Sequence, residues 1–405
     1  MPVTETSIAQ SPATGRGIDA TITDIRCHMV RSPRWSETKN VYRDEALLVE
    51  VKSDVGVSGW AETNGLMPGV KALVETETAH PRDHGPAHAL VGEPLDDAQR
   101  LISRLRANTV NRGRSGLGRV AVGAIETALL DLVGKLKGVP AHQLLDSGAT
   151  SARTSVPAYI TVFNKGTFDQ VVQKTKDDVD RAKAHGYRAF KIEATDFNTD
   201  ETEAVQLVEA VRDHVGDDTT LFVDNVFRWK TYEAAYKATT AYQSLGVAFL
   251  EDPFVPEAFE LSARLYDETK MTIAAGGSME SADRFVAAME LGGVSIVQPG
   301  THVGGLHEAD TVCREAAKRG KNVTTFSLCA TTLTPAASLQ LAAVNPVVSY
   351  VEYAPAALFP HLVLRQEIAG PEPDLRDGEL QLPPAPGLGV EVDTDAVQRF
   401  TISEY

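Results

Sequence analysis

The stretch Phe249-Leu-Glu-Asp-Pro-Phe254 ends one of eight short apolar runs that follow residue 155. A longer polar stretch with helical spacing separates each run from the next. The runs cover residues 156–162, 189–192, 221–223, 247–250, 271–274, 294–297, 322–325 and 348–351. Alternating strands and helices favour a parallel sheet, and strands buried on both faces have near-continuous apolar sequences. Eight such units predict an α/β protein with a (β/α)8-type barrel.

A doubly wound open sheet is the structural alternative to the barrel. That fold commonly carries a G-x-G-x-x-G turn after its first strand or a phosphate-binding P-loop. Neither motif occurs at the corresponding place in this sequence. The pattern therefore favours the barrel.

The chain before the first run has a different organisation. Residues 20–30 and 45–51 are rich in β-formers, and the turn Asp54-Val-Gly56 leads into a third such run. Apolar residues with helical spacing follow over 122–136, ended by Gly138-Val-Pro140. We predict a disordered tail at 1–17, an α+β domain at 18–150, the barrel at 151–358, and a segment at 359–405 that returns to the first domain.

Composition limits the partners and the compartment. Of the 405 residues, 43% are hydrophobic and 23% charged, as in ordinary globular proteins, and the net charge is -16. This charge disfavours binding to nucleic acid or to anionic membranes. Three scattered cysteines indicate neither a disulfide framework nor a zinc site, which suits the cytoplasm. No secretory signal and no apolar run of about 18 residues is present, so we expect no membrane segment.

Polar residues at the ends of the runs are the candidates for chemistry, because active sites of such barrels lie at the carboxyl ends of the strands. They are Tyr159, Lys191, Glu193, Asp224, Asn225, Glu251, Asp252 and Glu352. Carboxylates that converge at one barrel mouth need a balancing cation or partner. A hard metal such as Mg²⁺, which takes oxygen ligands, is the predicted cofactor.

Three of these stretches, Tyr187-Arg-Ala-Phe-Lys-Ile192, Phe222-Val-Asp-Asn225 and Phe249-Leu-Glu-Asp-Pro-Phe254, resemble the second, third and fourth barrel strands of the enolase superfamily. The flanking segments 124–140 and 386–392 support the mandelate racemase-like branch. The resemblance implies that residues of both termini form a domain capping the barrel. It also implies that a base removes the proton next to a substrate carboxylate while Mg²⁺ stabilises the enediolate.

Carried over residue by residue, the resemblance implies a role for several positions. Asp224 and Glu251 correspond to two of the three metal ligands, and Lys191 to the first lysine of a Lys-x-Lys pair. Glu352 corresponds to an acid that binds the substrate carboxylate. Trp35 and Asn40 lie in the region that covers the barrel mouth, and we expect them, with Tyr159, to contact the substrate.

The sequence departs from the family at four positions. The second lysine of the pair is Glu193, the third metal ligand falls on Gly277, and the Asp–His dyad of the opposite face falls on Gly300 and Phe326. As a repair, we predict that Glu193, Asp224 and Glu251 share the cation, with Glu280 as an alternative ligand. Lys191 is then the expected proton acceptor, its pKa lowered by the metal.

Replacements for the missing dyad are His302, the preferred catalytic candidate, and His307, with Cys329 further along the chain. Each candidate also has a structural alternative. Lys191, Glu193 and Glu352 could form ion pairs, the histidines could lie on the surface, and Trp35 and Asn40 could serve packing.

The predicted function is that of a metal-assisted dehydratase, a carbon–oxygen lyase acting on a sugar acid or a related hydroxy carboxylate. Bases on one face suit dehydration, whereas racemisation needs a base on each face. An isomerase or cycloisomerase of the same family is the first alternative. A non-catalytic relative that kept the fold is the second, because a fold alone does not fix a function. The resemblance also implies a homo-oligomer.

Overall fold

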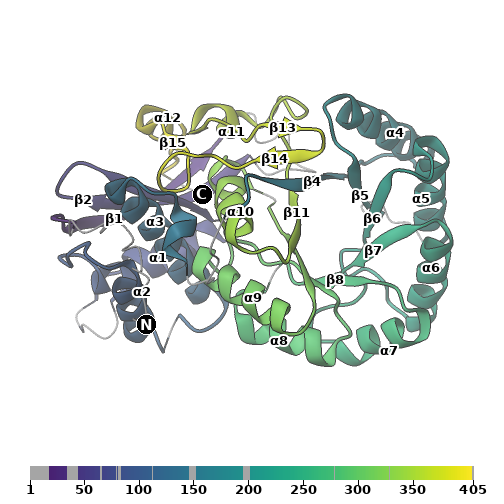
Figure 1. Cartoon of the computed structure of the whole chain (residues 1–405), viewed down its shortest axis with the longest axis horizontal. Helices are drawn as coiled ribbons and strands as arrows, with labels where there is room; N and C mark the ends of the chain where they lie inside the picture. The colour runs from purple at the N-terminus through teal and green to yellow at the C-terminus, as the bar shows by residue number, and fades with distance from the viewer. Residues whose placement is uncertain are drawn as a thin grey trace, which may run out of the picture.

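A computed structural model describes residues 18–33, 44–63, 66–78, 80, 84–111, 113–145, 152–194, 201–277, 279–327 and 329–403. Two bodies lie side by side along its longest axis, a domain formed mainly by the N-terminal part and a larger barrel (Figure 1). None of the described helices has both the length and the apolar character that crossing a membrane requires.

The larger body is a closed barrel of parallel strands. The strands are β4 (Ser155–Val162), β5 (Ala189–Glu193), β6 (Thr220–Asp224), β7 (Val247–Glu251), β8 (Ile273–Ala275), β9 (Ile296–Val297), β10 (Asn322–Thr325) and β11 (Val348–Glu352). Neighbours in sequence pair in parallel, and β11 closes the barrel by pairing with β4 through Glu352 and Tyr159. The predicted barrel is confirmed.

Helices between the strands form the outer ring of the barrel (Figure 1). They are α4 (Phe168–Ala184), α5 (Glu201–Val215), α6 (Tyr232–Ser244), α7 (Phe259–Thr269), α8 (Ala282–Leu291), α9 (Leu306–Lys318) and α10 (Leu333–Val344). The strands are thus covered on their outer faces by helices, while their inner faces pack on one another. This double burial is why their sequences are continuously apolar.

Aromatic side chains fill the barrel interior below the strand ends. The rings of Phe222 and Phe249 stack with centroids 4.0 Å apart, and the ring of Tyr159 meets that of Phe222 edge-on at 5.4 Å. Tyr350 packs against the same cluster. This aromatic layer, which we call the aromatic floor, lies directly below the charged residues at the strand ends.

The smaller body combines an antiparallel sheet with helices. The sheet has the order β1 (Ile22–Arg31), β2 (Glu45–Ser53), β3 (Ser58–Thr63), and the helices are α1 (Met67–Glu75), α2 (Ala98–Asn108) and α3 (Gly116–Lys137). Most of α3 is buried, since it packs on the sheet with one side and on the barrel with the other. We call this body the cap.

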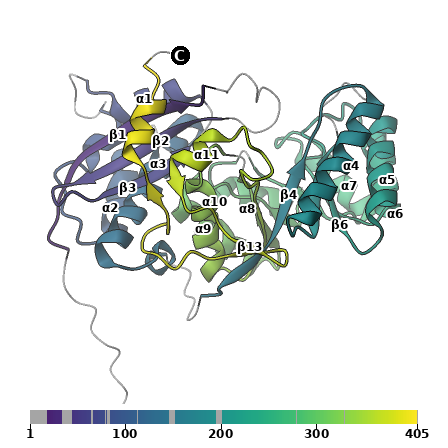
Figure 2. The ribbon, with the colours of Figure 1, turned by 90° about the horizontal axis from the view of Figure 1, so that it is seen from above.

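The C-terminal segment passes from the barrel to the cap. It contains α11 (Val363–Glu367), β12 (Ala369–Gly370), β13 (Leu375–Arg376), β14 (Glu379–Gln381), β15 (Glu391–Val392) and α12 (Thr394–Phe400). Strand β14 pairs antiparallel with β4, and beyond α12 the amide of Ile402 donates to the carbonyl of Met29 in β1 at 2.8 Å. Figure 2 shows α12 lying across the cap sheet. The residue boundaries of the domains stay a prediction, because the junction at 146–151 is outside the described residues.

The end of β3 joins the cap to the barrel mouth. Glu62 accepts hydrogen bonds from the amides of Ala330 (2.6 Å) and Thr331 (3.1 Å) and from the hydroxyl of Thr331 (2.8 Å), all in the loop after β10. Thr63 donates to the carbonyl of His302, after β9, at 2.7 Å. Because both loops follow the carboxyl ends of strands, the cap meets the barrel on the side where the chemistry is expected.

Candidate active site at the barrel mouth

Lys191 stands at the centre of a buried charge cluster. Its Nζ lies 2.8 Å from Glu251 Oε2, 3.3 Å from Glu352 Oε1 and 3.7 Å from Asp224 Oδ2. The four residues end or nearly end strands β5, β6, β7 and β11, so the barrel register alone brings them together. Lys191 is 1% exposed and Asp224, at 13%, is the most exposed member.

The carboxylates determine the protonation of Lys191. Burial by itself lowers the pKa of an ammonium group, but the charges of Glu251 and Glu352 outweigh it and raise the pKa of Lys191 well above its usual value. Lys191 is therefore a cation at neutral pH. The expected lowering of this pKa depends on a bound metal ion, and the role of Lys191 as proton acceptor stays a prediction.

The two carboxyl groups on β6 and β7 titrate far from their usual range. Burial raises the pKa of Asp224 to about 6 and that of Glu251 to about 8, and Lys191 moves both pKa values in the opposite direction. Because the groups interact, these values describe the titration of the pair. The cluster therefore holds at least one proton near neutral pH.

The backbone after β6 orients Asp224. The amide of Val226 donates to Asp224 Oδ1 at 2.9 Å, and Val226 has a φ of 48°, which is unusual for a β-branched residue. Asp252, directly after Glu251, also has a positive φ of 47°. Strained residues of this kind concentrate at functional sites. Glu193 pairs in register with Asp224, and its charge contributes to the raised pKa of that residue.

Glu352 is held by the barrel on both carboxylate oxygens. Thr161 donates its hydroxyl to Oε1, and the amide of Ser327 donates to Oε2 at 3.0 Å. With Lys191 as a third partner, Glu352 fixes the position of the ammonium group. Its predicted contact with a substrate carboxylate stays a prediction.

Gln298 is a member of the site that the sequence analysis missed. Its Nε2 donates to Glu251 Oε2 at 2.6 Å, and its Oε1 has no hydrogen-bond partner among the described residues. It is fully buried. Gln298 directly follows β9, so the rule that selected the other strand-end residues would have found it.

On the opposite side of the mouth, two side chains cover two glycines. A Cβ built on Gly277 would lie 3.1 Å from the ring of Phe326, and one on Gly300 would lie 3.0 Å from the ring of His302. The two rings face each other with centroids 5.3 Å apart. His302 and Phe326 thus fill the space that larger side chains at the two glycine positions would need.

His302 is buried and uncharged. Burial lowers its pKa to about 4, and neither ring nitrogen has a hydrogen-bond partner within the described part of the chain. A neutral imidazole with free nitrogens can donate one hydrogen bond and accept another. His302 is therefore a polar group that this side of the mouth can offer to a ligand.

Several other predicted residues do not join the cluster. Tyr159 belongs to the aromatic floor below the strand ends, with its ring centroid 5.3 Å from Lys191 Nζ, and its substrate contact stays a prediction. Glu280 accepts from the amide of Gly116 at 2.9 Å and so faces the cap. His307 lies 3.1 Å from Gln99 of α2. Trp35 and Asn40 lie outside the described residues.

The thiol of Cys329, the remaining candidate on the opposite face, is already engaged in a hydrogen bond. Its thiol donates to the carbonyl of Ser327 at 3.1 Å, and burial raises its pKa well above the usual value. A protonated, buried thiol is a poor nucleophile and a poor base.

The donors at the mouth do not fit a magnesium ion as arranged. Among the described residues, no group of three or more His, Cys, Asp or Glu side chains is placed to share a metal. The predicted trio of Glu193, Asp224 and Glu251 is therefore not assembled as a metal site. Magnesium stays a predicted cofactor, and the side chains as they are arranged here do not form a site for it.

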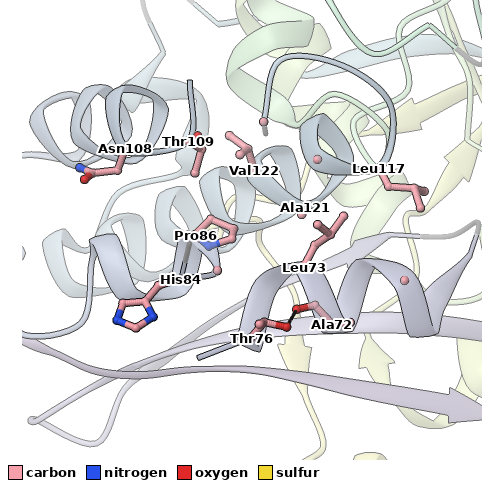
Figure 3. Close-up of a pocket in the computed structure, with 14 residues that line it drawn as sticks. Ala72, Leu73, Thr76, His84, Pro86, Asn108, Thr109, Leu117, Ala121 and Val122 are labelled. Carbon is pink, nitrogen blue, oxygen red and sulfur yellow. Dashed lines mark hydrogen bonds between the residues drawn. The ribbon is translucent and has the colours of Figure 1, made fainter. Parts of the chain in front are cut away.

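A cavity of about 530 Å³ lies elsewhere, between α1, α2 and α3 of the cap (Figure 3). Its walls are mainly apolar, with Leu73, Leu117 and Val122 among them, and His84 and Asn108 at its edge. It contains no strand-end residue of the barrel. The charge cluster and this cavity are separate features.

The fold and the site define a capped barrel with its charged groups at the strand ends, and the family models identify its class. Residues 174–396 match the enolase C-terminal domain-like family, and residues 18–146 match the mandelate racemase/muconate lactonizing enzyme N-terminal domain. The chain belongs to the mandelate racemase/muconate lactonizing enzyme group of the enolase superfamily. The resemblance noted in the sequence is confirmed.

Curated relatives cover nearly the whole chain. D-galactarolactone cycloisomerase of Agrobacterium fabrum (strain C58) is 26% identical over 95% of this chain and 99% of its own length. D-galactonate dehydratase of Variovorax paradoxus (strain S110) is 26% identical over 92% of each chain. A solved racemase of Streptomyces coelicolor A3(2) with bound magnesium has a TM-score of 0.78 and 24% identity, covering 94% of this chain and all of that one. This last likeness supports the fold.

Proposed function

We propose that this protein is a carbon–oxygen lyase that dehydrates a sugar acid or a related hydroxy carboxylate. One observation carries the proposal: Lys191, Asp224, Glu251 and Glu352 converge at the carboxyl ends of the barrel strands. Relatives named as dehydratases of galactonate and arabinonate support the substrate class. Dehydration removes the proton on C2 and the hydroxyl on C3, and the resulting enol becomes a 2-keto-3-deoxy acid.

The raised pKa values suit a division of roles between two neighbouring carboxyl groups. Asp224 has the less strongly raised pKa of the two and is the most exposed of the four residues, so it is the proposed acceptor of the C2 proton. Burial raises the pKa of Glu251 more than that of Asp224, so Glu251 is the proposed donor of a proton to the leaving hydroxyl. Pairs of groups with separated pKa values are typical of acid–base catalysis.

Two further residues complete the proposed mechanism. The ammonium of Lys191 lies beside both carboxyl groups and stabilises negative charge that develops on the substrate. Glu352 is a positioning residue, since it holds Lys191 from the far side. His302 is the proposed hydrogen-bonding partner on the opposite face. No step is assigned to a metal ion, because the donors do not fit one.

A cycloisomerase is the second candidate. The cycloisomerase of Agrobacterium fabrum matches this chain over nearly its full length, and cycloisomerisation begins with the same type of proton abstraction. The two reactions differ in their products, because a dehydratase releases water and an isomerase does not. We also propose that the protein is cytoplasmic and forms a homo-oligomer, and sedimentation of the purified full-length chain would test the oligomeric state.

To test the proposal, the protein is incubated in D₂O with galactonate, arabinonate, rhamnonate or galactarolactone, and the products are identified by proton NMR. A 2-keto-3-deoxy product supports the dehydratase, and an isomeric product without water loss supports the cycloisomerase. Asp224→Asn should lower the rate by about 10²–10⁴-fold, the usual loss for a general base. Asp218→Asn, at an exposed position ahead of β6, is the matched control. Neither turnover nor exchange of the C2 hydrogen on any of these acids would favour the non-catalytic alternative.

A further inference from the structure

The ammonium of Lys191 lies between the two carboxylates that the family resemblance assigns to the metal. Its distances are 2.8 Å to Glu251 Oε2 and 3.7 Å to Asp224 Oδ2. A magnesium ion bound by both residues would need one oxygen of each at about 2.0–2.1 Å. The ammonium group and a metal ion cannot occupy the space between these carboxylates together.

The oxygen of Glu251 that faces the cluster is already saturated. Oε2 accepts from Lys191 Nζ and, at 2.6 Å, from Gln298 Nε2. A carboxylate oxygen has about two lone-pair sites, so both are in use. Asp224 Oδ1 is likewise engaged, since the amide of Val226 donates to it. A metal bound through Glu251 Oε2 would have to displace one of the two donors to that oxygen.

A third protein ligand cannot reach the same point from β8. The ring of Phe326 lies over Gly277, where a Cβ would already be within 3.1 Å of it. Glu280, the acid nearest in sequence, is bound to the amide of Gly116 in the cap. The ring of Phe326 therefore occupies space that a side chain at position 277 would need.

We propose that the ammonium of Lys191 takes the place of the divalent cation, so that the barrel mouth carries its positive charge on a side chain. The charge is covalently attached, held by Glu251, Glu352 and Asp224, and independent of the metal supply. This inference concerns the same site as the proposed function. Its test needs no substrate, so failure of one can be told from failure of the other.

The test measures binding of Mn²⁺, as a probe for a divalent cation, to the metal-free full-length protein by the paramagnetic resonance signal of free Mn²⁺. Wild type and Glu251→Gln should bind equally little. One equivalent of Mn²⁺ bound by wild type and lost in Glu251→Gln would overturn the proposal. This comparison does not depend on any change to Lys191.

A second comparison tests whether the ammonium blocks a usable site. Lys191→Met, with circular dichroism to establish that it is folded, should bind Mn²⁺ at least about tenfold more tightly than wild type, which is a difference of about 1.4 kcal/mol. The gain should disappear in the double variant Lys191→Met/Glu251→Gln. If Lys191→Met is unstable, Lys191→Gln keeps a polar group of similar length. A folded variant that gains no binding would contradict the proposal.

Discussion

His302 is a titratable side chain without a charged partner to compensate its burial. Burial lowers its pKa to about 4, whereas an unfolded histidine titrates near 6.5. Between these values the unfolded chain binds more protons than the folded one, so stability falls as the pH drops from about 6.5 to about 4. The full loss is on the order of 3 kcal/mol, at about 1.4 kcal/mol for each unit of pKa.

We therefore predict that His302→Phe reduces the pH dependence of stability. The variant keeps an aromatic ring beside Phe326 and removes the titrating group. Urea unfolding at about pH 7 and pH 4.5 measures the difference, which should be about 2–3 kcal/mol smaller in His302→Phe than in wild type. His185→Gln, on the protein surface, is the control and should follow wild type. If the stability difference between the two pH values were the same in His302→Phe as in wild type, the prediction would be wrong.

Lys191 is the buried cation that three carboxylates share, and its removal leaves them without a counter-charge. Lys191→Met should lose on the order of 3 kcal/mol of unfolding free energy at pH 8. Burial already raises the pKa of Glu251 and Asp224 above their unfolded values, so these groups oppose folding increasingly as the pH rises. The loss should therefore be smaller at pH 5.

The double variant Lys191→Met/Glu251→Gln provides the internal control for that prediction. A neutral amide at position 251 removes the carboxylate that contacts Lys191 at 2.8 Å. Chemical denaturation should show the double variant to be more stable than Lys191→Met alone at pH 8. Equal stability of the two, or a loss that is the same at both pH values, would contradict the charge argument.

Among the described elements, α3 brings the backbones of the cap and the barrel close together at a glycine contact. Gly123 of α3 faces Gly304 and Gly305 at the start of α9, and a Cβ at position 123 would lie 2.4 Å from the carbonyl carbon of Gly304. Real Cβ atoms do not approach backbone that closely. Glycine is required at this point of the helix by the crossing and not by its backbone conformation, despite its cost in helix propensity.

We predict that Gly123→Ala destabilises the protein by about 1–3 kcal/mol, because the two elements must separate to admit the methyl group. Thermal unfolding followed by circular dichroism measures the loss. Gly69→Ala in α1 is the matched control, since its nearest contact would be the flexible side chain of Leu117 at 3.2 Å. The control should be neutral or stabilising, as alanine is the better helix former. A stable Gly123→Ala variant would refute the role of this contact.

At the scale of the whole molecule, the cap and the barrel share a buried polar junction. Glu62 is fully buried at the end of β3, and its carboxylate accepts from the amides of Ala330 and Thr331 and from two threonine hydroxyls. Arg365, also buried, lies near enough to favour its charge. This junction couples the two bodies, because the acceptor Glu62 belongs to the cap and the donors belong to the barrel.

We expect Glu62→Ala to uncouple the unfolding of the cap from that of the barrel. Trp60 reports on the cap and Trp229 on the barrel, so urea unfolding can be followed in Trp35→Phe/Trp229→Phe and Trp35→Phe/Trp60→Phe backgrounds, which leave one tryptophan each. With Glu62 present the two probes should give one midpoint, as a cooperative transition requires. With Glu62→Ala the cap should unfold at lower urea, by on the order of 2 kcal/mol for the buried donors left unpaired. Coincident midpoints in that variant would argue against the coupling.

The amino-acid sequence by itself determined the barrel and the positions of the charged residues at its strand ends. Continuous apolar runs separated by helical stretches are a local property, because burial on both faces of a parallel strand acts on every residue of the run. The polar residue that ends each run then lies at the mouth by geometry alone. This reasoning gave Lys191, Asp224, Glu251 and Glu352, and it could have given Gln298.

Only the tertiary structure decided which of these groups touch and what charge they carry. The placement of the Lys191 ammonium among three carboxylates depends on contacts between strands distant in sequence, and the charges of these carboxylates raise its pKa. The cover of Phe326 over Gly277 and of His302 over Gly300 is equally non-local. Burial and pairing are properties of the packed barrel, because the same side chains in an extended chain would each be surrounded by water.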